Sequence, residues 1–540
     1  MLISATQLES LPKTEICIVG GGAIGLSLAA RLAETGVEVL LVEAGGPEPS
    51  VQSQAFYAGQ VVDPAVHWPL DTYRVRALGG TTGLWGGRVV PYDPIDFEER
   101  AWVPYSGWPI SFAEVAAYYP AAVAACEAGS YDFTPPGPLV PNLDGDLLHT
   151  TLERFSRPTQ FWRLNGERLR KSRTVRVAVD AAVTAIRLNH DRTRVTGLEV
   201  TMPDGRRLPI EASSYVLAMG GLETTRLLLN TPDLPGGEAD GWLGRGYMCH
   251  LAATLGEVHF TGPSRAIAFD YFRDAAGVYM RRRLALTAEA QRQNQVMNLA
   301  ARLHIRDHLD PAHGDPVLSL MYLAAFVIKY EYSRAAREAD RSAKTYARHL
   351  LNLLAHPVQL FRFLSTWGVK RYFGSRKIPS IVLFSKHNRY PLEFSGEQAP
   401  NRDSRVRLCD ERDAFGVRRL EIDWRITALD VETVTRSYQV IGRELERTGT
   451  GRLDFDPETT ESAILQAGAY GGHHSGTTRM AADPRHGVVD GNCRVHGLAN
   501  LFVASTSVLP TSSQANPTLT GIALGLRLGD HLLRQRPEAA

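Results

Sequence analysis

The sequence predicts an α/β protein, α+β overall, whose first unit is a pair of parallel strands joined by a helix. Ile16–Val19 is a short apolar run typical of a buried strand, and Leu26–Thr35 carries apolar residues at helical spacing. Gly36 then ends the helix, and Val37–Val42 forms a second apolar run. Because parallel strands need a crossover connection, residues 16–42 are expected to form a Rossmann-like βαβ unit.

A glycine-rich segment separates the first strand from the helix, and this context predicts a dinucleotide site. Gly20 permits a tight turn, Gly22 lets the backbone approach a pyrophosphate, and Gly25 allows strand and helix to pack closely. The phosphates are expected at the helix N-terminus, beside Ala23 and Ile24, because free N–H groups and the helix dipole favour an anion there.

Glu43 ends the second strand and is followed by Ala44, and both are expected to border the nucleotide. A carboxylate at this position accepts hydrogen bonds from the two hydroxyls of a ribose. NAD and FAD sites share the glycine pattern, so the pattern does not choose between them. A single N-terminal unit, with no second glycine motif of equal quality, favours FAD over NAD.

The composition is that of an ordinary globular chain. Its 540 residues correspond to three or four domain-sized units. The 59 Lys and Arg balance 58 Asp and Glu, so no global field favours nucleic acid and no such partner is expected. Five scattered cysteines argue against a disulfide scaffold or a zinc site, and no metal is expected. Without a secretory signal, and with Val317–Ile328 as the longest apolar run, we expect a cytoplasmic protein without a transmembrane segment.

The chain between these regions carries two further patterns. Residues 56–110 are rich in Gly, Pro and Trp without periodicity, which is typical of a functional loop. Residues 170–220 alternate in polarity, with Asp204-Gly205 as a turn signal, and predict β-hairpins that return to a buried strand. The runs are Val175–Val179, Val183–Leu188 and Val195–Val200, and the buried strand is Tyr215–Met219.

Residues 333–377 predict a basic helical insertion. This segment has ten Lys and Arg against two acidic residues, a local net charge of +8. Apolar residues from Ala347 to Phe361 follow three- and four-residue spacing, and Pro357 is expected to kink or break the helix. We interpret it first as a solvated helix packed on its domain. The alternatives are an oligomer contact, a membrane-surface patch or a dock for a redox partner.

Four motifs follow one another near the C-terminus. They are Gly471–Met480 (GGHHSGTTRM), Gly487–Asp490 (GVVD), Cys493–Leu501 (CRVHGLANL) and Asn516–Thr520 (NPTLT). In this order they resemble the glucose–methanol–choline (GMC) family of FAD-dependent oxidoreductases. Leu78–Gly87 is similar to that family's flavin-contacting loop, and Val216–Leu229 is similar to its second nucleotide-side strand–turn–helix.

The resemblance implies a site that oxidises an alcohol to a carbonyl. His473 occupies the base position of the H-x-x-G-T frame, and Asn516 occupies the position of the group that holds the substrate oxygen. Histidine suits proton removal because its pKa lies near neutral pH. His474 is the alternative base, or it orients His473 through a hydrogen bond.

The resemblance also implies the contacts of a non-covalent FAD. Pyranose oxidases of fungal type carry a flavin-linked histidine where this chain has Leu84, so the FAD is expected to be non-covalent. They also carry a threonine near the reactive flavin nitrogen where this chain has Gly86, which argues against fast reaction with oxygen, and oxygen, quinone and protein acceptors all stay open. For Trp85, core packing is an equal alternative to a flavin contact. The implied ring contacts are Gly79, Gly80, Thr81, Gly83, Trp85 and Gly86. The implied adenine contact is Val183, and Ser505, Thr506, Pro517 and Thr518 are implied on the other side of the ring system.

Within the family, Glu397–Val406 and Ile422–Trp424 look most like the branch of pyranose oxidases, C-glycoside 3-oxidases and fructose or gluconate dehydrogenases. The resemblance implies two interleaved domains, a Rossmann-like FAD-binding domain and a substrate domain with a β-sheet floor and helices. The expected FAD domain comprises residues 10–110, 170–250 and 450–540, and the expected substrate domain comprises residues 250–450.

Three functions remain open from the sequence. The first is oxidation of a sugar or glycoside hydroxyl. The second is oxidation of a non-sugar alcohol or biosynthetic intermediate, with electrons passed to a quinone or protein. The third is a non-catalytic flavin-binding partner protein, which the presence of both His473 and Asn516 disfavours.

Overall fold

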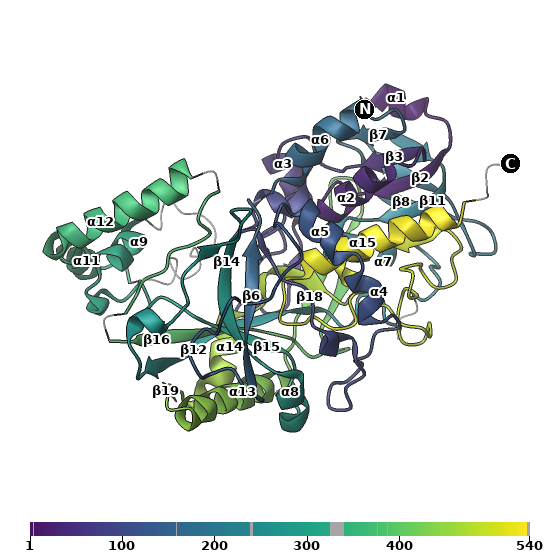
Figure 1. Ribbon diagram of the computed structural model, residues 1–540. Helices are drawn as coiled ribbons and strands as arrows, with labels where there is room; N and C mark the ends of the chain where they lie inside the picture. Colours follow the sequence, from purple (N-terminus) through teal and green to yellow (C-terminus); the bar gives the residue numbers. More distant parts are fainter. Residues whose placement is uncertain are drawn as a thin grey trace.

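Two large sheets organise the chain (Figure 1). In the view of Figure 1, the N-terminal strands and the C-terminal helix lie at the upper right, and the second sheet lies below them. Among the residues that the structure describes, none of the helices has both the length and the apolar character needed to cross a bilayer. The computed structural model describes residues 1–3, 5–157, 159–237, 241–324, 340–374, 376–385 and 387–536.

The first sheet has six parallel strands and contains the predicted βαβ unit. Its order is β1 (Leu2–Ile3), β7 (Val175–Ala178), β3 (Val39–Val42), β2 (Thr14–Val19), β11 (Ala212–Leu217) and β21 (Leu501–Val503). The crossover helix α2 (Ala23–Leu32) packs against the C-terminal helix α15 (Pro517–Arg534). Glycines permit this close approach, because a Cβ at Gly525 would lie 2.6 Å from a side-chain carbon of Ile24. The βαβ prediction is confirmed, and the C-terminal segment completes the same layer.

The hairpin prediction was wrong for its first strand. Strand β7 pairs in parallel with β3, with Val175 opposite Val39, and so belongs to the six-stranded sheet. A run of four residues is too short for its spacing to distinguish a parallel strand from one arm of a hairpin. The predicted turn at Gly205 does join two antiparallel strands. The small antiparallel sheet consists of β8 (Ala182–Leu188), β9 (Val195–Thr201) and β10 (Arg207–Ile210).

The second sheet has nine strands and draws them from distant parts of the chain. Helix α13 (Ala428–Arg447) packs beneath it (Figure 1), and its buried side includes Val434, Tyr438 and Ile441. Strand β6 enters this sheet from residues 148–155, ahead of the expected substrate domain. Along the main path the strands are β19 (Gly451–Asp454), β12 (Met248–Phe260), β16 (Arg389–Gly396), β15 (Leu299–Leu303), β14 (Tyr279–Leu286), β6 (Leu148–Phe155) and β5 (Arg88–Val89). Strands β13 (Phe272–Arg273) and β20 (Tyr470–Ser475) pair with β14 and β12.

A third, three-stranded sheet and several short helices complete the described fold. Strands β17 (Arg405–Arg412), β18 (Arg418–Asp423) and β4 (Gln60–Val61) form a third sheet. The short helices are α1 (Ala5–Glu9), α3 (Val51–Gln54), α4 (Phe112–Ala116), α5 (Tyr119–Ala125), α6 (Phe161–Lys171), α7 (Gly220–Leu229), α8 (Ala288–Asn294), α9 (Pro316–Ala324) and α14 (Thr460–Ala467).

The basic insertion forms α11 (Ala343–Ala355), α12 (Pro357–Gly368) and a π-helical turn, η6 (Val369–Phe373). Pro357 begins α12, so the predicted break is confirmed. Both helices pack against α9, as the interpretation of a solvated helix packed on its domain expects, but Leu354 and Phe361 of the apolar positions are about three-quarters exposed. Residues 333–339 and 375 of the predicted insertion lie outside the described residues, as do residues 325–328 of the apolar run whose first part forms buried α9.

Candidate active site

A cavity of about 790 Å³ is lined by residues of both large sheets. Gly20, Gly22 and Glu43 line it from the six-stranded sheet, on what we call the nucleotide side. Arg281 and Arg302 line it from the nine-stranded sheet, on what we call the floor side. The cavity therefore lies where one layer can hold a cofactor and the other a substrate.

The glycine turn between β2 and α2 fits the pyrophosphate of FAD. A Cβ at Gly22 would meet no atom within 4 Å, so this backbone faces open space. In contrast, a Cβ at Gly25 would lie 2.0 Å from the carbonyl oxygen of Gly20, which has a φ of 108°, so these two glycines build the turn itself. Gly22 is also the N-cap of α2 and has no side chain to occupy the first N–H groups, which leaves them available to an anion.

Glu43 has a second role that the sequence pattern did not suggest. Its carboxylate accepts hydrogen bonds of 2.7 Å from the backbone N–H of Gly21 and of Gly45, and so connects the glycine turn to the end of β3. Burial raises the pKa of Glu43, against the opposing effect of these N–H donors. The side chain lines the cavity from a fixed position, as a ribose contact requires.

Most of the predicted cofactor residues meet on this cavity wall. Those that line it are Gly20, Gly22, Ala23, Ile24, Glu43, Ala44, Gly80, Thr81, Trp85, Gly86, Val183, Thr506, Pro517 and Thr518. Gly25, Gly79, Gly83 and Ser505 do not line it. Gly25 is enclosed by the glycine turn, and Ser505 caps the short helix η8 (Thr506–Val508) through a hydrogen bond to Ser507.

The tryptophan of the predicted flavin loop is anchored as well as cavity-lining. Trp85 follows the 3₁₀ turn η2 (Gly80–Gly83), and its Nε1–H donates to the carbonyl of Thr159 over 2.9 Å. Its ring also lies 6.1 Å from that of Phe161. Trp85 therefore packs on α6, as the core-packing interpretation expects, and also borders the cavity, where a flavin contact stays a prediction.

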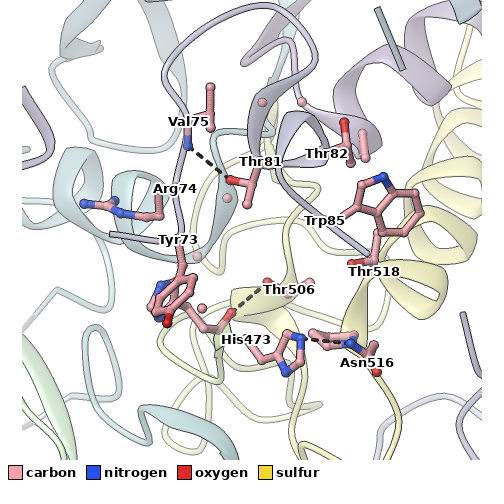
Figure 2. A pocket seen from close by; sticks show the side chains of 18 of the residues that line it. Tyr73, Arg74, Val75, Thr81, Thr82, Trp85, His473, Thr506, Asn516 and Thr518 are labelled. Carbon is pink, nitrogen blue, oxygen red and sulfur yellow. Dashed lines mark hydrogen bonds between the residues drawn. The ribbon is translucent and has the colours of Figure 1, made fainter. Parts of the chain in front are cut away.

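His473 and Asn516 lie side by side on the cavity wall, and their side chains point toward each other (Figure 2). His473 lies on β20, Asn516 is the N-cap of α15, and the Nδ2 of Asn516 lies 2.9 Å from the Nε2 of His473. The Oδ1 of Asn516 accepts a hydrogen bond of 2.7 Å from the Nε–H of Arg88. Since a guanidinium can only donate, this bond fixes the amide orientation, and Nδ2 must be the donor to His473. The Nε2 of His473 is then an acceptor, the form that a base needs.

The surroundings of His473 keep it neutral. Burial lowers the pKa of His473 well below its usual value, and His250 and Arg88 lower it further. The ring of His250 lies 4.6 Å away at a steep angle, and its Nε2–H donates to the carbonyl of Ser512. A neutral imidazole is available to accept a proton at physiological pH.

His474 points into a different hydrogen-bonded chain, as alternation along a strand requires. The Nδ1–H of His67 donates to the carbonyl of Trp68 over 2.6 Å, so its Nε2 accepts from the hydroxyl of Tyr247 at 2.9 Å. The Tyr247 oxygen must then accept from the Nδ1–H of His474, 2.6 Å away. Burial lowers the pKa of His474, too, but its partner is the phenol of Tyr247 and not the amide of Asn516.

Sequence reasoning missed Arg88, Glu153 and Tyr247. Arg88 directly follows the predicted flavin loop, and its guanidinium lies 3.5 Å from the fully buried carboxylate of Glu153. Burial alone would raise the pKa of Glu153, but Arg302 and Arg88 hold it below its usual value. No local signal identifies these residues, because their partners lie tens to hundreds of positions away in the chain.

The floor side of the cavity carries more positive than negative charge. Arg302 forms a bidentate ion pair with Glu393, with distances of 2.7 and 2.8 Å. Arg88 and Arg281 also line this side, and burial lowers the pKa of the neighbouring His304, which favours its neutral form. Polar groups that can both donate and accept hydrogen bonds therefore face the space next to His473 and Asn516.

Two family models match this chain, one for each of the two segments that form the cavity wall. The family model described as FAD dependent oxidoreductase matches residues 15–318, and the one described as GMC oxidoreductase matches residues 400–525. The first segment contains the glycine turn and Glu43, and the second contains His473 and Asn516.

Full-length similarities agree with these matches. Paromamine 6'-oxidase from Streptomyces fradiae is 26% identical, over 95% of this chain and 90% of that protein. The fructose dehydrogenase large subunit from Gluconobacter japonicus is 22% identical, over 96% of this chain and 97% of that protein. Among solved structures, formate oxidase from Aspergillus oryzae shares the fold with a TM-score of 0.54 and 16% identity, over 97% of this chain and 98% of that one.

Proposed function

The chain belongs to the GMC family of FAD-dependent oxidoreductases and acts on CH–OH donors, and on this premise we propose that its substrate is a hydroxyl group of a neutral sugar or glycoside. The pairing of His473 with Asn516 carries the proposal. An acceptor and a donor 2.9 Å apart are complementary to a hydroxyl, which donates to the first and accepts from the second.

In the proposed reaction, the Nε2 of His473 takes the hydroxyl proton while Asn516 Nδ2–H holds the oxygen as negative charge develops on it. FAD, when bound, supplies the acceptor for the hydride that leaves the same carbon. Arg88 acts through Asn516 by fixing its amide, and the positive charge of Arg88 also favours the developing alkoxide. The glycine turn, Glu43 and the loop around Trp85 would hold the cofactor without a covalent bond.

The charges on the floor side favour a neutral substrate over a polycation. Arg88, Arg281 and Arg302 line it, and Glu393 is already bound by Arg302. Buried Glu153 lies beside Arg88, so three arginines stand against two carboxylates. An ammonium group would therefore meet an excess of like charge, whereas sugar hydroxyls can bond with arginine N–H groups and with carboxylate oxygens. The full-length similarity to a fructose dehydrogenase subunit supports a sugar.

The test is anaerobic reduction of the bound flavin, followed by loss of its yellow absorbance, with neutral sugars, glycosides, amino sugars and simple diols. We expect a neutral sugar or glycoside to reduce it fastest, and an amino sugar of equal size to be at least about tenfold slower. Fastest reduction by a non-sugar alcohol would replace the proposal with that substrate class. No reduction by any alcohol, with FAD still bound, would make the chain a flavin-binding partner.

Two further readouts belong to the same experiment. Admitting air after reduction measures the electron acceptor directly, since rapid recolouring identifies an oxidase and slow recolouring a dehydrogenase that uses a quinone or protein. Precipitation with acid should leave all yellow colour in the supernatant, because Leu84 offers no nucleophile to the flavin. Colour retained in the pellet would contradict the non-covalent assignment.

A further inference from the structure

The insertion formed by α11, α12 and η6 carries its apolar side outward. Between residues 350 and 373 lie nine large apolar side chains that are exposed, of seventeen in the described part of the chain. We call these nine the insertion face. Val358, Phe361 and Phe373 belong to it and are 79%, 75% and 85% exposed. Large apolar side chains that are exposed together in one short segment indicate a binding site, because isolated monomers rarely leave such a group in water.

Polar side chains of α11 face the protein, whereas α12 contacts it through the partly buried Trp367. His349 Nδ1 lies 3.0 Å from Ser319 Oγ, its ring stacks on Tyr322 at 3.9 Å, and Asn352 donates to Ser319 and Pro311. A surface helix ordinarily does the reverse and buries its apolar side. The insertion is thus anchored by the polar contacts of α11 and by Trp367 of α12, and both leave the insertion face for another partner.

The positive charge around the insertion face indicates which kind of partner it binds. Residues 341–392 contain ten Lys and Arg and no Asp or Glu. Lys344, Arg362 and Lys370 are exposed on the same helices as the apolar side chains. A second copy of the chain would bring an equal positive charge against the first, which opposes self-association through this face. An anionic surface with an apolar interior satisfies both the charge and the apolar side chains.

Length and composition indicate that the helices lie on such a surface. Helices of 13 and 12 residues extend only about 20 Å each, against about 30 Å for the hydrocarbon core of a bilayer. Tyr372, which belongs to the insertion face and is exposed, is one of the aromatic residues typical of the membrane–water interface. We propose that the insertion face docks on the surface of an anionic lipid bilayer.

Docking there would bring the cavity close to the bilayer. Directly after η6, Ile378 packs with Phe155 and Tyr279, and Arg371 donates to the carbonyl of Ile378 over 2.8 Å. The next four residues, 379–382, line the cavity. The segment that faces the bilayer is therefore continuous with a wall of the active-site cavity.

The test is flotation of the FAD-loaded full chain with phosphatidylcholine vesicles that either contain or lack phosphatidylglycerol. We expect flotation with the anionic vesicles, weakened by salt. The variant Leu354→Ser/Phe361→Ser/Phe373→Ser should lower the partition coefficient at least about tenfold. Lys344→Glu/Arg362→Glu/Lys370→Glu should remove the preference for the anionic lipid. The matched control is Val51→Ser/Val62→Ser/Leu164→Ser, which removes three exposed apolar side chains elsewhere and should float like the unmodified protein.

Failure of the unmodified protein to float with anionic vesicles would overturn the proposal, as would undiminished flotation of the triple serine variant. Dimerisation that this variant abolishes, without vesicle binding, would assign the face to a second copy instead. Vesicle binding needs no substrate, so its outcome is independent of the proposed sugar oxidation. Bound flavin absorbance in each variant shows that the chain has folded.

Discussion

The Nε–H of Arg88 donates to the Oδ1 of Asn516 over 2.7 Å and thereby sets the proton position on a third residue. With its oxygen held, the Asn516 amide can present only N–H to His473. Arg88 lies at the start of β5, and its other side approaches buried Glu153, so the guanidinium is held from both sides. Glu153 thus lies against Arg88, Arg88 holds the amide of Asn516, and Asn516 donates to His473, the predicted base.

Replacing Arg88 with methionine should slow flavin reduction at saturating substrate by about 10- to 100-fold, because the amide of Asn516 then rotates freely. Arg88→Lys should restore part of the rate, since an ammonium also only donates. The readout is the limiting rate of anaerobic reduction. Arg282→Met serves as the control, because its Nε donates to the carbonyl of Gly137, away from the cavity. A raised KM with an unchanged limiting rate would make Arg88 a substrate contact and not a positioning residue.

His473→Ala should keep bound FAD and slow its reduction by about 10²- to 10⁴-fold, the usual contribution of a general base. His474→Ala should have a smaller effect, about tenfold, because His474 bonds to Tyr247 and not to Asn516. Stopped-flow absorbance of the two variants decides between them. If the larger loss occurs in His474→Ala, the base is His474.

The limiting rate of flavin reduction should fall at acidic pH, where His473 becomes protonated. Because the pKa of His473 is lowered, the neutral imidazole persists as pH falls through 6.5 and is lost only at more acidic values. The limiting rate should therefore stay level from pH 8 down through pH 6.5 and fall only at more acidic values. A decline that begins near pH 7 would show that the base is not the buried His473.

Replacing Gly22 with alanine should weaken FAD binding, whereas replacing Gly25 with alanine should impair folding. The new Cβ at position 22 projects into open cavity space, so the protein should fold but bind FAD at least about tenfold more weakly. At position 25 the Cβ would meet backbone at 2.0 Å, and folding itself should suffer. Gly83→Ala, where nothing lies within 4 Å and φ is not positive, is the matched control. Dialysis against free FAD, with circular dichroism for the fold, separates these outcomes.

The parts of the site that lie close together in sequence were predictable, and the parts assembled from distant segments were not. Strand, glycine turn, helix and Glu43 form one local unit whose spacing carries its chemistry. His473 and Asn516 are separated by more than forty residues, and only the resemblance of their motifs paired them. The contact of Arg88 with Asn516 spans most of the chain and leaves no periodic or compositional signal.

The insertion shows the same limit in another form. The three- and four-residue spacing predicted which side of the helix is apolar and where Pro357 interrupts it. Spacing does not say which side faces the protein, and the usual assumption that the apolar side is buried was wrong here. The polar contacts of His349 and Asn352 with Ser319 of α9 determine which side of α11 faces the protein, and these contacts depend on tertiary structure alone.

Buried histidines should make the free energy of unfolding depend on pH. Burial lowers the pKa of His67 and of His250 to about 4, against 6.5 for an ordinary histidine. Between these values the unfolded chain binds more protons than the folded one, so stability rises with pH and is lost as pH falls from 6.5 towards 4. At about 1.4 kcal/mol per pKa unit, each contributes about 2 kcal/mol between pH 7 and pH 5. Denaturant unfolding of the FAD-loaded protein at both pH values measures this. The difference between the two pH values should shrink in His67→Gln and stay unchanged in His190→Gln, which alters an exposed histidine. An equal difference in all three proteins would mean that His67 does not carry this pH dependence.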